Sequence, residues 1–402
     1  MGPNSDSLNR EIVRVNETTR RMLDEYVAWG EKITAGEVQH AAYDEMLDFL
    51  NFRMETAASC LLLIENEKVA DSLGLSRSLL EHYLLFMLMC RGYKFFRIQD
   101  LSAALTESQF KARLKVEQEK LRELQARGET SCLEVRKAPR VSRRLMYVFE
   151  GLRSQDEPDF MIPAHYFQFQ NFRPEELRLK EDDYFQYYER EPETKKALKE
   201  NRDDAALNYK FYLSYDGLLE CLELNEIIDS AVIARVEAHY TFLGKFLHPT
   251  HNAARELHER SNWYSGGTAV GIDQQYSRTS VLLASLYVCY LVSGLLDEAA
   301  GLIEGAPVKY VSRAGTEELR TLMAGIQRDF PYFWFLFNDP PLYDRFNYCI
   351  HHATDDELRE WGHYSNVPNE RVPFDQHIYS HLQHALGGWS NVRCGVYPPP
   401  AT

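Results

Sequence analysis

The segment from residue 70 to residue 96 constrains the fold most, because after Arg77 it is apolar on almost every side of a helix. A helix that is apolar all round belongs in the middle of a bundle, where neighbouring helices cover each face. Three ionisable residues, Arg77, Glu81 and His82, stand at the head of this apolar segment. Burying a charge is costly unless the group is paired or used in chemistry, so the three residues mark either a packing device or a site.

Apolar residues recur at helical spacing through most of the chain. The pattern predicts helices over residues 5–33, 37–68, 70–96, 106–127, 204–225, 227–246 and 276–303, with shorter ones at about 315–329, 354–362 and 374–386. Sustained strand alternation is absent from the sequence and β-branched residues are sparse, so strands are not expected. The longest apolar stretch, residues 281–296, is short for a membrane span of ~20 residues and predicts a buried central helix.

We therefore predict an all-α fold: a helical bundle with an irregular aromatic-rich insert and a C-terminal helical extension. Residues 1–130 form the N-terminal helical block, and residues 204–305 form a second helical block that packs on the first. Between them, residues 131–203 carry five prolines and several aromatic clusters, which predict short helices and loops. Residues 306–402 form the C-terminal extension.

The net charge of −15 argues against a protein that binds nucleic acid over its whole surface, since such a protein carries a broad basic face. The densest basic segment, residues 136–144, is either a local basic groove or a solvated linker; no aromatic residues interleave its charges, which favours the linker. The seven cysteines are scattered without a Cys-x-x-Cys pair, which favours free thiols and a cytoplasmic location. Neither a secretory signal nor a membrane partner is expected.

Arg77 and Glu81 are four residues apart and share one face of a helix, whereas His82 is turned partly aside. One interpretation is that Arg77 and Glu81 form a buried pair that fixes helix packing, with His82 hydrogen-bonded to a neighbour. The other interpretation is that the three residues belong to a functional site.

The Arg-x4-His spacing of Arg77 and His82 resembles the motif of the HEPN superfamily, whose members are helical bundles and many of which cleave RNA in toxin–antitoxin and phage-defence systems. The resemblance implies a metal-independent endoribonuclease in a defence or stress pathway, or a catalytically silent relative. It implies that Arg77 holds the scissile phosphate and that His82 is the general acid or base, with the RNA 2′-hydroxyl as nucleophile. Glu81 would orient Arg77, and such a site is often completed across a dimer interface.

A second resemblance joins Arg77-Ser-Leu-Leu-Glu81 to the later stretch from Tyr240 to His248-Pro-Thr. It is similar to an uncharacterised group of bacterial helical proteins with Arg-x-x-x-Glu and a distal His-Pro-Ser/Thr, and it covers about residues 40–96 and 205–300. The resemblance implies that Arg77, Glu81 and His248 approach one another.

The histidines around His248 predict a polar face, and His251 is expected beside His248 in the same pocket as Arg77. Metal binding is disfavoured, because the sequence has no His-Glu-x-x-His motif, no Cys–His pairing and no second Glu-x-x-His copy. We predict neither a metal nor another cofactor.

A different function class also fits the sequence: a non-catalytic helical scaffold or sensor that binds a protein partner through the aromatic insert or the C-terminal extension. The two classes differ in exposure, because catalytic groups must line a concave pocket whereas a packing clamp can be enclosed. If RNA is a partner, the acidic surface predicts a narrow local site for it. A homodimer is expected under either function, because residues 70–96 are more apolar than a small bundle would bury.

Overall fold

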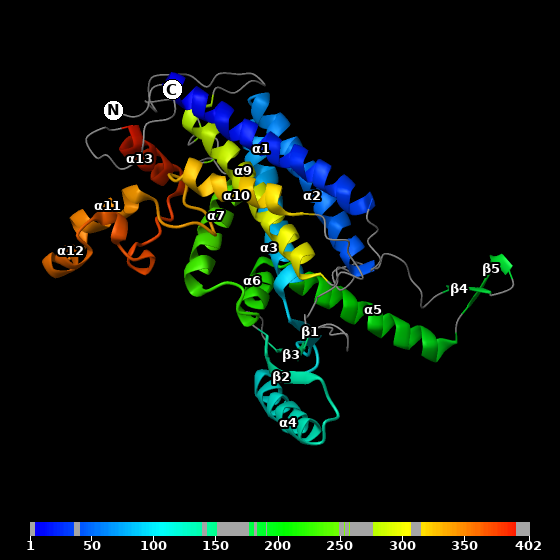
Figure 1. Cartoon of the computed structure of the whole chain (residues 1–402). Helices are drawn as coiled ribbons and strands as arrows, with labels where there is room; N and C mark the ends of the chain where they lie inside the picture. Colours follow the sequence, from blue (N-terminus) through cyan, green and yellow to red (C-terminus); the bar gives the residue numbers. More distant parts are fainter. Residues whose placement is uncertain are drawn as a thin grey trace, which may run out of the picture. The chain divides into compact units, whose positions relative to one another are not determined.

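The computed structural model describes residues 5–35, 41–138, 143–150, 177–180, 183–189, 191–248, 276–306 and 315–390, with Ala253 and Leu257. The chain divides into two compact units (Figure 1). The first comprises Met1–Tyr83 and Asp229–Thr402, and the second, Leu84–Ile228, is inserted into its sequence. The predicted blocks, with boundaries at residues 130, 203 and 305, divide the chain elsewhere, because local patterns do not reveal which distant helices pack together.

The first unit is built around the apolar helix α9, Arg278–Gly305. This helix contacts α1 (Ser5–Ala35), α2 (Ala41–Glu65), α10 (Glu317–Asp329) and α13 (Ile378–Ser390). By length and composition alone α9 could cross a membrane, but 94% of its most apolar window is buried in the structure. Every residue from Ser280 to Leu296 is buried, as the prediction of a central helix requires.

The other helices of the first unit agree with the all-α prediction. They are α7 (Ser230–Leu247), α11 (Leu342–His351), α12 (Asp355–Trp361) and the 3-10 turns Tyr364–Asn366 and Asn369–Arg371, with the first part of α3 (Val69–Arg91) up to Tyr83. Some of these helices begin at a side-chain cap; for example, Asp229 accepts a hydrogen bond from the Val232 amide at 2.8 Å at the start of α7.

The predicted C-terminal extension is part of the first unit's core rather than an appendage. Its aromatic run, residues 330–337, is buried along most of its length. The rings of Phe333 and Phe335 lie 5.2 and 5.8 Å from the ring of Tyr290 on α9, centroid to centroid. The segment therefore fills the core beside the central helix, because rings of this size stabilise the fold most when they are fully buried.

The second unit contains a three-stranded antiparallel sheet that the sequence did not predict. Its strands are β1 (Lys94–Asp100), β2 (Cys132–Lys137) and β3 (Arg144–Glu150), in the order β1-β3-β2. The prediction extended the third helix to residue 96, but α3 ends at Arg91 and β1 follows at once. The basic segment at residues 136–144, favoured as a linker, includes the end of β2 and the start of β3.

Helices complete the second unit around this sheet (Figure 1). They are α4 (Glu107–Ala126), α5 (Pro192–Tyr212) and α6 (Tyr215–Leu224); a two-stranded hairpin of β4 (Leu177–Lys180) and β5 (Asp183–Glu189) also lies in the predicted insert. α4 packs on β2, where Phe110 and Leu121 form a cluster with Cys132, Val135 and Leu145. The long helices remain the dominant structure of the described chain, so the fold is mostly α-helical.

Side chains from the helical part of this unit accept hydrogen bonds from the backbone amides on the free edge of β1. Tyr212 accepts a hydrogen bond from the Phe96 amide, and Asn208 accepts one from the Ile98 amide at 2.7 Å. The Asn225 side-chain oxygen accepts from the Lys94 amide, also at 2.7 Å. An exposed strand edge is a template for pairing with another chain, and these contacts close it.

Candidate functional site

Arg77 lies between α3 and α7, and its guanidinium is engaged on both helices. Its Nε donates to Glu81 Oε1 at 3.2 Å, and its Nη2 donates to the Tyr240 hydroxyl at 2.5 Å. The guanidinium carbon lies 4.2 Å from the centroid of the Tyr240 ring, a cation–π distance. The Arg77 side chain is 13% exposed and that of Glu81 is 40% exposed. Arg77 therefore links the two helices from a nearly enclosed position.

Gly244, one turn after Tyr240 on α7, leaves the space that the guanidinium occupies. A Cβ atom added at this glycine would lie 3.1 Å from Arg77 Nη1, closer than ordinary contact. The Tyr240 hydroxyl stays neutral as it accepts the hydrogen bond, because burial and the nearby Glu81 charge raise its pKa. The local sequence of α7 thus accommodates Arg77 in two ways: the ring of Tyr240 contacts the guanidinium, and Gly244 has no side chain to block it.

His82 faces a different helix from the one that Arg77 reaches. Its Nδ1 accepts a hydrogen bond from Arg53 Nη1 on α2 and lies 3.3 Å from Ser78 Oγ. Its ring stands edge-on to Phe49, also on α2, with the centroids 5.8 Å apart. Burial, together with the Arg53 charge, lowers the pKa of His82 to about 4, so the ring is neutral at pH 7.

The structure brings together only part of the predicted site. Arg77 and Glu81 are paired as expected, but no hydrogen bond or ring contact joins Arg77 to His82 within the described residues. His248 ends α7 as an exposed cap whose amide donates to Gly244 O at 3.1 Å. His251 lies outside the described residues.

His239, one of the histidines grouped around His248 in the sequence, is a core residue. Its Nδ1 lies 2.8 Å from the Tyr287 hydroxyl and its Nε2 lies 3.1 Å from the Trp334 carbonyl oxygen. Complete burial lowers the pKa of His239 to about 3. Both ring nitrogens are used in holding α7 to α9 and to the aromatic run, so this histidine has a structural role.

Sequence reasoning missed Tyr240 and Arg53, the two partners that decide where the predicted residues point. Tyr240 stands inside the quoted motif, and its four-residue spacing to Gly244 was a signal for a close approach by another side chain. Arg53 carries no such signal, because it is one of several charged residues on an amphipathic helix.

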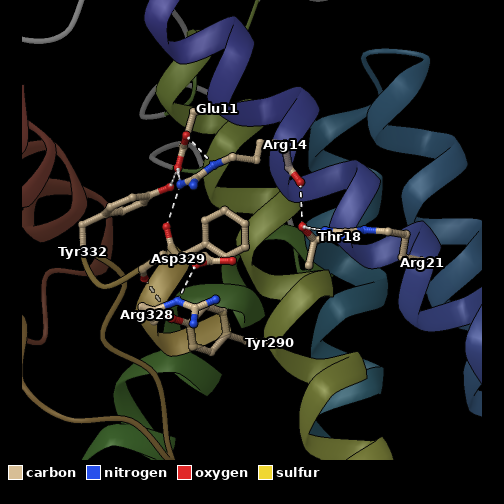
Figure 2. A network of polar contacts seen from close by, with 9 residues as sticks. Glu11, Arg14, Thr18, Arg21, Tyr290, Arg328, Asp329 and Tyr332 are labelled. Carbon is tan, nitrogen blue, oxygen red and sulfur yellow. Dashed lines mark hydrogen bonds and ion pairs between the residues drawn. The ribbon is translucent and has the colours of Figure 1, made fainter. Parts of the chain in front are cut away.

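A second buried polar group joins α1 to the segment after α10 (Figure 2). Glu11 is 1% exposed and accepts hydrogen bonds from Arg14, at 2.6 Å from Nη2 and 3.1 Å from Nε, and from the Tyr332 hydroxyl. Arg14 Nη2 also donates to the Asp329 carbonyl oxygen at 2.6 Å. The arginine side chain is partly exposed, but the carboxylate is enclosed and fully paired, as a structural ion pair must be.

In the part of the chain that the structure describes, no group of three or more His, Cys, Asp or Glu side chains is arranged to hold a metal ion. Comparison with protein-family models, with curated proteins and with solved structures found no match.

Proposed function

We propose that this protein is a non-catalytic helical scaffold or sensor, in which Arg77, Glu81 and Tyr240 form a clamp between α3 and α7. One observation carries the proposal: the Arg77 guanidinium is committed to Glu81 and Tyr240, while His82 accepts from Arg53 on another helix. Cleavage by an arginine–histidine pair requires both groups to reach the same phosphate. Neither group is free to do so in this arrangement.

The protonation of His82 supports the same proposal. A general acid or base works best when its pKa lies near the operating pH. With its pKa lowered to about 4, His82 holds no proton to donate at pH 7 and is a weak acceptor for one.

The experiment is an RNA cleavage assay at pH 7 in EDTA, with the wild type and the variants Arg77→Ala and His82→Ala. The scaffold function predicts no cleavage by any of the three proteins, nor by an Arg122→Ala control, which removes an exposed arginine of the second unit. Cleavage by the wild type and the control that is lost in both site variants, while their folded fraction is unchanged, would establish the ribonuclease and overturn the proposal.

A cytoplasmic location and a homodimer belong to the proposal as well. The location is supported by the six cysteines that the structure describes, all of which are free thiols, because a reducing compartment keeps them so. Light scattering on the purified protein tests the dimer, and a strict monomer would contradict it.

The partner-binding surface has to be sought away from the aromatic run of the C-terminal extension, because that run is buried in the first unit. Much of the predicted aromatic insert, residues 151–176, lies outside the described residues. The sheet of the second unit is one described region where partly exposed aromatic side chains lie together.

A further inference from the structure

One face of the sheet is only half covered by the described helices of the second unit. Phe95, Arg97 and Gln99 occupy every second position of β1, so their side chains lie on this face. Phe95 lies opposite Phe149 of β3 in the strand register, and Arg97 lies opposite Tyr147. α4 packs over the β2 side of the same face and its core cluster reaches Tyr147 and Phe149 of β3, whereas Arg97 and Gln99 of β1 are exposed; among the described residues, the β1–β3 side is the open half of this face.

The open half of the face contains a pocket. It has a volume of about 290 Å³ and is lined by Arg97, Ile98, Gln99, Tyr147 and Phe149. Arg97 and Gln99 are exposed, and the three aromatic rings of this region are half-buried. The pocket is therefore reachable from solvent and has aromatic walls, which suits a small planar group.

The aromatic side chains offer a surface for stacking. The rings of Phe95 and Phe149 are stacked across the strands, with centroids 5.1 Å apart and planes 17° apart. Beside them, the Tyr147 hydroxyl donates to Gln99 Oε1 at 3.2 Å and holds its ring in place. Partly exposed rings fixed on a sheet are the surface on which unpaired nucleobases stack.

Among the residues that line this pocket, Arg97 alone is charged, although the whole chain is acidic. Two ion pairs of α4 and the sheet are neutral as pairs: Arg113 with Glu117 at 2.6 Å, and Arg144 with Asp100 at 2.7 Å. Arg97 forms no ion pair with any described residue. One guanidinium beside aromatic rings complements one phosphate beside one base.

We propose that this open half-sheet binds single-stranded RNA, with a base against the aromatic rings and a phosphate on Arg97. A duplex is excluded as the ligand because its bases are stacked within the helix. A folded protein partner fits less well, because a stable interface needs a far larger area than one pocket of this size. The proposal rests on the proposed function, in that RNA is the partner that the scaffold binds without cutting.

The test measures fluorescence anisotropy of a 5′-labelled eight-nucleotide oligouridine with the full-length protein in EDTA, over a range of salt concentrations. Wild type is compared with Arg97→Gln, Phe95→Leu and the control Arg122→Gln, which makes the same charge change at an exposed position on α4. Arg97→Gln is expected to weaken binding and to reduce the slope of log K against log salt by about 0.7. Phe95→Leu is expected to weaken binding about 5- to 150-fold, and the control to bind as wild type does.

The proposal is overturned if the wild type binds the oligouridine no better than an RNA duplex of equal length, or if Arg97→Gln binds as the wild type does. It is also overturned if heparin competes fully while Phe95→Leu has no effect, because binding would then depend on charge alone. Arg97 is exposed, so its variant remains informative even if the Phe95 variant unfolds. Cleaved RNA on a gel would instead refute the non-catalytic function, so failure of that function can be told apart from failure of RNA binding at the half-sheet.

Discussion

The hydroxyl of Tyr332 is expected to stabilise the first unit more than an ordinary buried hydroxyl does. It donates to Glu11, which is 1% exposed and carries a charge balanced by Arg14. Hydrogen bonds to charged groups contribute about 1.5–3 kcal/mol, and the two bonds from Arg14 that remain in the variant favour the lower half of that range. Tyr332→Phe should therefore lower the free energy of unfolding by about 2 kcal/mol, without a change in ring volume.

Urea unfolding followed by tryptophan fluorescence measures this loss. None of the five tryptophans of the chain falls within Leu84–Ile228, the range of the second unit, so the signal does not report that unit. With an m value of about 3 kcal/mol/M, a loss of about 2 kcal/mol moves the unfolding midpoint down by about 0.7 M.

Tyr290→Phe is the matched control. Tyr290 is as fully buried as Tyr332, but its hydroxyl donates to the neutral carbonyl of Phe330 at 2.9 Å. Such a bond contributes about 1 kcal/mol, which predicts a midpoint shift of about 0.3 M. If Tyr332→Phe costs no more than Tyr290→Phe, then Glu11 is not a charged acceptor in the folded protein and the reasoning is refuted.

Three further outcomes are expected. Burial alone would lower the pKa of His381, but its partly buried partner Asp344, 2.9 Å away, raises this pKa on balance above 6.5. The stabilising contribution of the pair is therefore present below pH 6.5 and is lost as the pH rises through the folded pKa; Asp344→Asn should flatten this loss in unfolding curves measured against pH. Gly294→Ala should destabilise the first unit by about 1–2 kcal/mol, because the new Cβ would come within 2.7 Å of a buried tyrosine ring. Gly30→Ala meets no atom within 4 Å and should stabilise the unit by up to about 1 kcal/mol. Equal unfolding midpoints of the two variants in urea would contradict both expectations. Asn225→Ala should speed hydrogen exchange at the first amides of β1 by at least about tenfold, and unchanged exchange there would mean that the strand edge is protected by other groups.

The helices were predictable because their signal is local and long. Residues 281–296 are mostly apolar and contain no charged residue, which is typical of a buried helix. The position of α1 was equally clear, because its apolar stripe extends over many turns. β1 was missed because its alternation covers only Phe96 to Gln99 and follows an apolar helix directly.

The site was predictable only as far as spacing along one helix reaches. The i, i+4 spacings along the helix, such as that of Arg77 and Glu81, determine which side chains can pair. They carry no information about Tyr240, which is distant in the sequence and reaches Arg77 only because α3 packs against α7. The direction of His82 depends in the same way on where α2 places Arg53.

The insertion of one unit into the sequence of the other sets an order in which the chain can fold as it is synthesised. α1 and α2 must wait for their principal partner, α9, which begins at Arg278. At translation rates of about 5–20 residues per second, the interval from Glu65 to Arg278 lasts roughly 10–40 s. Throughout that time the inserted unit can complete its sheet, while the apolar stripes of the first two helices have no α9 to cover them. This interval is when the nascent chain most needs a chaperone, and a transcript truncated before α9 would yield a product prone to aggregation.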